Sequence, residues 1–170
     1  MQRLRFLLLF AVSWGGGAVS AAETSAARFQ LITLDPGHFH ASLVQKFMYA
    51  DVDPLVHLYA PVGDDVVEHL KRVERFNTRA EQPTKWRQRN YTAPDFLEKM
   101  LAERAGNVVV ISGNNTRKTD YIVRAIDAGL NVLGDKPMVL TPADLVRLEQ
   151  AFKTAEAKHV LLYDIMTERF

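Results

Sequence analysis

The feature that most constrains the fold is the alternation of short apolar runs with longer amphipathic stretches along the 170 residues. The clearest run, residues 108–111, is continuously apolar and β-branched. Such strands are typical of a parallel sheet buried on both faces, and parallel neighbours need a crossover, usually a helix. The sequence therefore predicts an α/β fold with a doubly wound parallel sheet. We expect strands at 29–34, 55–59, 90–91, 108–111, 131–133 and 160–163, and helices at 38–48, 64–76, 96–104, 116–128 and 141–157.

Local signals mark several helix ends. Residues 92–95 and 141–144 both have the Thr-x-x-Asp spacing expected of a capping box. Gly129 follows the fourth expected helix, in the position where glycine commonly ends a helix. Asp64 and Asp65 are expected to cap the N-terminus of the second helix.

The first 22 residues differ from the rest of the chain. Arg3 and Arg5 precede an apolar run at 6–12, and small residues follow at 18–22. This layout predicts a secretory signal peptide at 1–22, and hence an exported protein, periplasmic or extracellular. The apolar run is too short to span a bilayer, so no stable membrane span is expected after cleavage. An uncut N-terminal anchor is the alternative.

The charge balance narrows the range of partners. Lys and Arg number 21 against 20 Asp and Glu, which gives a formal net charge of +1. A nucleic-acid-binding domain usually carries a strong basic excess, so we expect no nucleic-acid partner. The chain has no cysteine, which is compatible with an oxidising compartment.

The tetrad Gly-Asp-Lys-Pro at 134–137 lies between an expected strand and an expected helix. Proline fixes its own backbone and restricts the residue before it, so Lys136 should be held in a defined place. At the carboxyl edge of a parallel sheet, this lysine would point into the crevice where such folds bind ligands. For an isolated Lys-Pro pair, a solvated loop lysine is the alternative.

The turn after the first strand reads Asp-Pro-Gly-His-Phe-His. A dinucleotide-binding turn has the pattern G-x-G-x-x-G, whose backbone amides meet a pyrophosphate at the helix start. Asp35 and His40 replace the outer glycines, and Gly37 keeps the middle one. An altered nucleotide-binding turn would place Gly37, His38 and Phe39 against the cofactor. The alternative is an ordinary strand-to-helix turn whose glycine supplies an unusual backbone angle.

The same turn contains a His-x-His pair, His38 and His40. This pair resembles the first metal-binding motif of amidohydrolases, where two histidines hold zinc at the end of a barrel strand. Only His57, His69 and His159 remain as further histidines, and such a barrel takes about 250 residues. We therefore predict no metal site, and a metal-dependent hydrolase is the weakest alternative.

The apolar run at 108–111 leads into Ser112, Gly113, Asn114 and Asn115. Small and amide-bearing residues at a strand end let a flat ligand approach the backbone. We expect Ser112, Gly113 and Asn115 to contact a cofactor. Asn115 could equally cap the next helix, and both roles can coexist at a helix start that faces a ligand.

Taken together, these residues resemble the glucose–fructose oxidoreductase/inositol dehydrogenase (Gfo/Idh/MocA) family. The family pattern is a strand, ATPN-x-x-H, a helix ending AGxxV, and then EKP. The corresponding residues here are Ser-Gly-Asn-Asn at 112–115, Lys118, Ala-Gly-Leu-Asn-Val at 128–132 and Asp-Lys-Pro at 135–137, with the spacing kept. Lys118 stands at the usual histidine position, a departure that bears on cofactor affinity more than on the fold.

The resemblance implies a role for each residue of the last motif. Lys136 would be the catalytic residue, which binds substrate or helps move the hydroxyl proton during hydride transfer. Asp135 would support its position, and both would line the cofactor site with Pro137. NAD or NADP would be the cofactor, and a sugar or glycoside the substrate.

The resemblance also implies a domain layout. The NAD(P)-binding Rossmann-like domain would occupy 28–164, and 165–170 would begin a linker to a second domain that this chain lacks. That domain is an open antiparallel sheet with most substrate contacts, so the 170 residues alone should be inactive. The full-length protein is expected to be a homo-oligomer. A sugar-binding or interaction module without catalysis is the alternative function.

Overall fold

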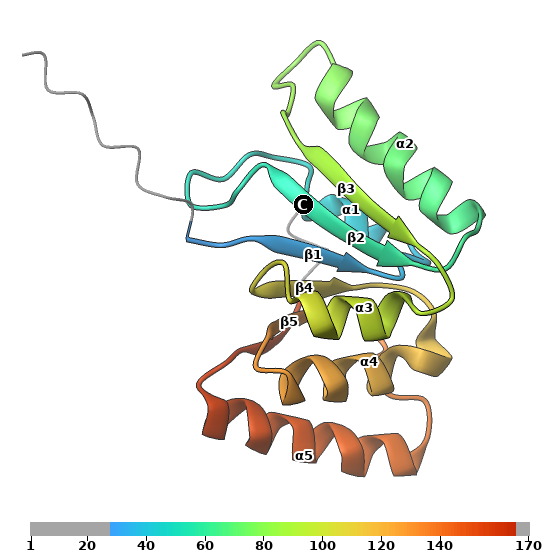
Figure 1. Cartoon of the computed structure of the whole chain (residues 1–170), viewed down its shortest axis with the longest axis vertical. Coiled ribbons are helices and arrows are strands. Elements are labelled where there is room, and N and C mark those ends of the chain that lie inside the picture. Colours follow the sequence, from blue (N-terminus) through green and yellow to red (C-terminus); the bar gives the residue numbers. More distant parts are fainter. Residues whose placement is uncertain (1–27, 166–170) are drawn as a thin grey trace, which may run out of the picture.

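Six parallel strands form one sheet in the order β3-β2-β1-β4-β5-β6. The computed structural model describes residues 28–165 (Figure 1). The predicted α/β fold with a doubly wound parallel sheet is confirmed, because this strand order is that of the Rossmann fold. The strands are β1 (Leu31–Leu34), β2 (Leu55–Ala60), β3 (Arg87–Thr92), β4 (Val108–Ile111), β5 (Asn131–Gly134) and β6 (Leu162–Asp164), and the helices are α1 (His40–Leu43), α2 (Asp64–Thr78), α3 (Phe96–Glu103), α4 (Asn115–Asp127) and α5 (Pro142–Lys158).

The strand order reverses between β1 and β4, which pair from Leu31 with Val108 to Leu34 with Ile111. From β1 the chain crosses to α1 and β2 on one side, and from β4 it crosses to α4 and β5 on the other (Figure 1). The chain therefore leaves these two strands in opposite directions at the carboxyl edge. Such a switch point is where open α/β sheets bind their ligands.

Helices cover both faces of the sheet (Figure 1). One face packs against α1 and α2, and the other packs against α3, α4 and α5. The side chains of β4 divide between the two cores: Val108 and Val110 belong to the first, and Val109 and Ile111 to the second. All four are buried, which explains why the strand is continuously apolar in the sequence.

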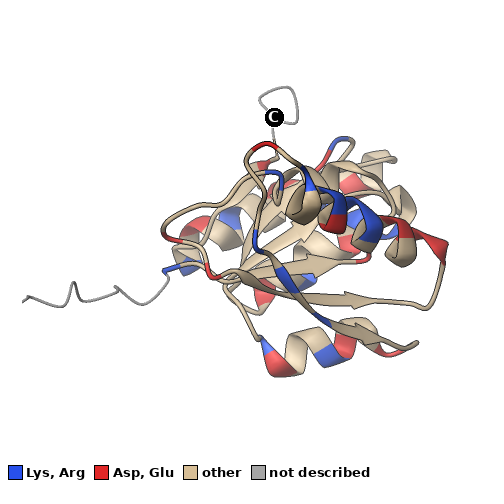
Figure 2. Cartoon of the chain, turned by 90° about the horizontal axis from the view of Figure 1, so that it is seen from above, with Lys and Arg blue, Asp and Glu red and all other residues tan. Residues whose placement is uncertain are grey.

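Acidic and basic residues are interspersed along the helices (Figure 2). Within residues 28–165, no helix has the length and apolar character needed to cross a bilayer. The predicted signal peptide at 1–22 lies outside the described residues, as does the predicted linker apart from Ile165.

One of the two predicted capping boxes is confirmed. At the start of α5, Thr141 Oγ1 accepts a hydrogen bond from the Asp144 amide at 3.1 Å, and the Asp144 carboxylate accepts from the Thr141 amide at 3.2 Å. The box predicted at 92–95 is wrong, because α3 begins after Asp95 without a side-chain cap. The Asp95 carboxylate instead accepts a hydrogen bond from the Tyr91 hydroxyl at 2.8 Å.

Two other local predictions need correction. The helix expected at 38–48 is only four residues long, because amides 45 and 46 bond three residues back, to Ser42 and Leu43, in tight turns. Arg79 Nη2 holds this turn by donating to the Lys46 carbonyl at 2.6 Å. The N-cap residue of α2 is Gly63. Asp64 and Asp65, which were predicted as caps, lie in the first turn, where their negative charges interact favourably with the helix dipole.

We predict that His69 makes stability depend on pH. The side chain is 1% exposed, and neither ring nitrogen has a hydrogen-bond partner among the described residues. Burial lowers the pKa of His69 from its ordinary 6.5 to about 4. In the unfolded chain His69 takes up a proton near pH 6.5, whereas the folded chain resists it, so stability is full above pH 6.5 and is lost toward pH 4.

The loss attributable to His69 should reach on the order of 3 kcal/mol by pH 4. Urea denaturation at pH 7 and pH 4.5 would measure it, with His69→Leu lacking this part of the pH dependence. His159→Asn is the matched control, because His159 is exposed. The prediction is wrong if the wild type and His69→Leu lose stability in parallel.

Candidate functional site

The loops that follow β1, β4 and β5 meet at the carboxyl edge of the sheet. They enclose a pocket of about 250 Å³, and the prediction that the loops around Gly37 and Pro137 share one rim is confirmed. Residues from all three loops line this pocket: Gly37, His38, Gly113, Asn114, Asn115, Asp135, Lys136 and Pro137.

Two glycines allow the first two loops to touch. A Cβ on Gly113 would lie 2.3 Å from the carbonyl carbon of Gly37, and Gly113 also has a φ of +88°. A Cβ on Gly37 would lie 2.9 Å from Asn114 Nδ2. The contact at Gly113 is with backbone and excludes any side chain there, whereas a Cβ on Gly37 would press mainly on the Asn114 side chain, which can shift. Gly113 is therefore the position that the contact between the loops requires to be glycine.

The carboxylate of Asp35 points into the protein. Asp35 is 4% exposed, and its Oδ2 accepts a hydrogen bond from the Tyr121 hydroxyl at 2.7 Å. Burial raises the pKa of Asp35, and the bond from Tyr121 opposes that rise. The acidic residue at the first position of the glycine pattern therefore does not face the pocket.

Asp135 is the centre of a buried polar network. Its carboxylate lies 3.0 Å from His40 Nδ1 and 3.1 Å from Ser112 Oγ, which donates to it. His38 Nδ1 lies 3.5 Å away. Burial would raise the pKa of Asp135, but the contacts with His40 and Ser112 outweigh it and lower the pKa below its ordinary value. His40 thus fills the place of the third glycine and joins the first loop to the third.

Lys118 fixes the backbone of the loop after β5. The side chain is fully buried, and its Nζ donates to the Asp135 carbonyl at 2.9 Å and to the Lys136 carbonyl at 3.4 Å. Burial lowers the pKa of Lys118. One turn of α4 therefore holds the loop that presents Lys136, whose peptide bond to Pro137 is cis.

Seven of the nine predicted site residues line the pocket. Ser112 is fully buried beneath it and reaches Asp135 instead. Phe39 is 44% exposed, and its ring lies against His38 and His40. The cofactor contacts expected of all nine residues and the catalytic role expected of Lys136 stay predictions. Sequence reasoning missed the structural role of Lys118, since a lysine early in a helix is usually a solvated residue.

A second hollow of about 400 Å³ lies beside the first, toward β2, and includes Asn114. Arg117 and Asp65 bring opposite charges to it. The two hollows share Asn114, so an elongated ligand at the switch point could extend from one to the other. The lining residues are Asp35, Pro61, Val62, Gly63, Asp65, Val66, Asn114, Thr116 and Arg117.

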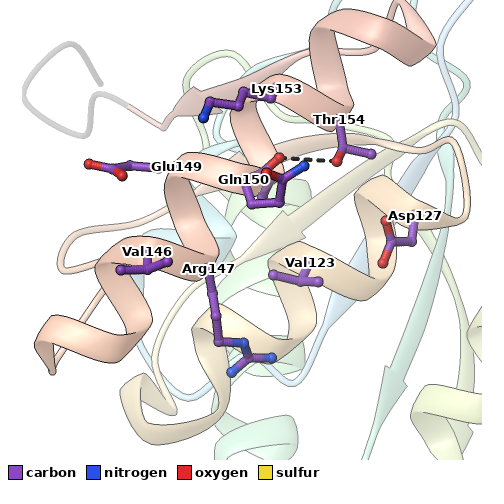
Figure 3. A pocket seen from close by; sticks show the side chains of 9 residues that line it. Val123, Asp127, Val146, Arg147, Glu149, Gln150, Lys153 and Thr154 are labelled. Carbon is purple, nitrogen blue, oxygen red and sulfur yellow. Dashed lines mark hydrogen bonds between the residues drawn. The ribbon is translucent and has the colours of Figure 1, made fainter.

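A third hollow, of about 380 Å³, lies between α4 and α5 (Figure 3). Arg147 and Lys153 lie at its rim, and none of the predicted site residues lines it. Its lining residues all belong to these two helices and not to the three loops that meet at the carboxyl edge of the sheet. The candidate site is therefore the loop pocket around Lys136.

The sequence profile of the oxidoreductase family with an NAD-binding Rossmann fold, GFO_IDH_MocA, matches residues 66–163. The chain belongs to this family. The suspected resemblance is thus confirmed, and with it an NAD(P)-binding domain. The match begins after the turn that contains His38 and His40, so the altered glycine pattern lies outside it. A search of curated proteins gave no match.

Solved structures support the same fold. A protein from Parabacteroides merdae ATCC 43184, classed among the oxidoreductases, is 55% identical, with a TM-score of 0.82, over 86% of this chain and 33% of that one. GenD2 from gentamicin A biosynthesis, crystallised with NAD, is 20% identical, with a TM-score of 0.56, over 82% of this chain and 34% of that one. UDP-N-acetylglucosamine 3-dehydrogenase GnnA from Acidithiobacillus ferrooxidans is 16% identical, with a TM-score of 0.52, over 80% of this chain and 36% of that one. The chain spans about a third of the length of these relatives.

We predict that Lys118→Met destabilises the fold by about 1–3 kcal/mol, because the buried Asp135 carbonyl and the partly buried Lys136 carbonyl lose their donor. Chemical denaturation would measure the change in the free energy of unfolding. Lys153→Met is the matched control, since Lys153 is exposed on α5 and its replacement should change stability by less than about 0.5 kcal/mol. Equal stability of the two variants would contradict the role given to Lys118.

Proposed function

We propose that this chain is the nucleotide-binding part of an exported NAD(P)-dependent oxidoreductase that acts on sugars or glycosides. The observation that carries the proposal is the pocket at the switch point, where Lys136 meets the glycine loops of β1 and β4. Membership of an oxidoreductase family supports the reaction class, and the pocket is where the cofactor and substrate would bind.

The residues at the switch point fit a dinucleotide. Two adjoining hollows share Asn114, as a ligand with two nucleotide halves requires. The buried Asp35 carboxylate accepts a hydrogen bond from Tyr121 and does not line the Lys136 pocket, and in the second hollow the positive charge of Arg117 opposes its own. Gly37, His38 and Gly113 would hold the middle of the cofactor, and Lys136 would lie at its nicotinamide end. When bound, the nicotinamide accepts or delivers a hydride.

Lys136 is proposed to bind the substrate hydroxyl and to help move its proton. Three donors fix the loop that carries it: His40 and Ser112 contact the Asp135 side chain, and Lys118 bonds the backbone. A catalytic group that is positioned in advance loses little freedom when substrate binds. Asp135 is 3% exposed and bonded on both oxygens, so its role is to position the loop.

Two observations support export and a sugar substrate. The first 22 residues have the layout of a signal peptide. A structurally similar protein, GnnA, is named for a dehydrogenase reaction on UDP-N-acetylglucosamine. In the full-length protein, a second domain would complete the substrate site, and the whole would form a homo-oligomer.

The proposal predicts that the full-length protein binds one nicotinamide nucleotide per chain. Heat or acid should release NAD(H) or NADP(H) from the purified protein, and calorimetry should detect binding to protein stripped of nucleotide. Chromatography of the released material would also distinguish the two cofactors. The absence of both released nucleotide and measurable binding would overturn the proposal.

Lys136→Ala should lower the rate of hydride transfer on the order of 100-fold or more, because proton transfer at the substrate loses its catalyst. Nucleotide binding should be largely kept, and nicotinamide absorbance would follow the rate. Lys153→Ala, an exposed lysine on α5, is the matched control. An unchanged rate in Lys136→Ala would exclude Lys136 as a catalytic residue.

The altered glycine turn favours one second candidate, a sugar-binding or interaction module without chemistry. Such a module would keep its activity when Lys136 is replaced, and it would carry no nucleotide. The barrel hydrolase is excluded, because the described residues form an open six-stranded parallel sheet.

A further inference from the structure

His38, His40 and Asp135 form a cluster of possible metal ligands, a property that goes beyond the cofactor contact and loop positioning proposed for them above. One ligating atom of each residue lies within 4.8 Å of the others. His38 lies in the loop after β1 and His40 begins α1, whereas Asp135 comes 95 residues after His40, directly after β5. Sequence reasoning looked for further histidines and missed a carboxylate that only the strand order brings near.

The spacing of the three side chains suits a small transition-metal ion. Asp135 Oδ1 lies 3.0 Å from His40 Nδ1, and Asp135 Oδ2 lies 3.5 Å from His38 Nδ1. Ligands at about 2.0–2.1 Å from tetrahedral zinc are separated by roughly 3.3–3.4 Å, between these two distances, which run to different oxygens of Asp135. The ligand atoms of the two histidines lie within 4.8 Å of each other. Both imidazoles direct Nδ1, an atom that can ligate zinc, toward the carboxylate.

The hydrogen bonding leaves one of these atoms unsatisfied. His38 Nδ1 is buried, and among the described residues it has no hydrogen-bond partner. The His38 side chain as a whole is 41% exposed, whereas those of His40 and Asp135 are 11% and 4% exposed. The cluster is thus open on the His38 side, toward the pocket, and closed on the protein side. A buried nitrogen without a partner needs an explanation, and a ligand is one.

Neighbouring groups hold the cluster in place. Ser112 Oγ donates to Asp135 Oδ2 at 3.1 Å, and Lys118 Nζ donates to the Asp135 carbonyl at 2.9 Å. Hydrogen bonds of this kind orient the ligands of metal sites and are part of their affinity. Asp135 therefore has a fixed side chain and a fixed backbone.

We propose that His38, His40 and Asp135 bind one divalent transition-metal ion, with Zn²⁺ as the test ion. Two histidines and one carboxylate are a ligand set for zinc and also for Fe²⁺. Three protein ligands leave a position open, and the pocket shared by His38, Asp135 and Lys136 is where it would face. An oxygen ligand, such as a substrate hydroxyl or carbonyl, fits that position.

The local charge sets the expected strength of binding. Lys118 and Lys136 both act on His38 electrostatically, and their positive charges oppose a cation. Three ligands and two nearby ammonium groups predict weaker binding than in a closed four-ligand zinc site. We expect a Kd of about 1 μM, which corresponds to roughly −8 kcal/mol. A His40–Asp135 hydrogen-bonded pair that binds no metal is the competing interpretation.

Titration of the full, metal-free chain with ZnCl₂ tests the proposal. Calorimetry should give one Zn²⁺ per chain, and CoCl₂ should give the visible absorption of four-coordinate Co²⁺, which Zn²⁺ displaces. His38→Ala and Asp135→Asn should each weaken binding by about 100-fold or more, and Ser112→Ala, which removes an orienting bond, by about 10-fold. Asp135→Asn keeps the shape of the side chain, and circular dichroism would check that each variant is folded.

His159→Asn is the matched control, because it removes an exposed histidine at the end of α5 and should leave Zn²⁺ binding unchanged. No stoichiometric binding by the wild type, or equal binding by the wild type and Asp135→Asn, would overturn the proposal. Nucleotide binding measured on the same samples is an independent result. Zn²⁺ binding without nucleotide would count against the proposed function alone, and nucleotide without Zn²⁺ against the metal site alone.

Discussion

The bond between His40 and Asp135 is the interaction on which the rest of the site depends. It joins the loop after β1 to the loop after β5 across the width of one strand, β4. In a glycine-rich nucleotide turn, close packing of helix and strand sets the position of the first loop. Here α1 is only four residues long, and a buried hydrogen bond takes over that task.

The fold could be read from the sequence because its signals are local and repeated. The continuous apolar run of β4 requires burial on both faces, and that requirement leads to a parallel sheet. The ends of the helices were harder to predict. Thr141 and Asp144 form their capping box, whereas Asp95 prefers the Tyr91 hydroxyl, a partner from the preceding strand that no spacing rule includes.

The site was foreseen only in part. The position of Lys136 follows from a strand and a proline, both visible in the sequence. The network beneath it does not, because Lys118 reads as a surface lysine and Asp135 as a family motif residue. Their partners become apparent only once β1, β4 and β5 are neighbours. Buried polar contacts between residues far apart in the sequence depend on the fold topology, so they cannot be predicted from composition.

The contact between Gly37 and Gly113 has a consequence for redesign. Any side chain on Gly113 would collide with the backbone of the facing loop, so the two loops are interlocked surfaces and not independent variable segments. A library that diversifies the first loop to change ligand preference must keep Gly113 in the facing loop and vary His38 or Phe39. The outer rim of this pocket can therefore change, whereas the backbone contact at Gly113 leaves no room for a side chain.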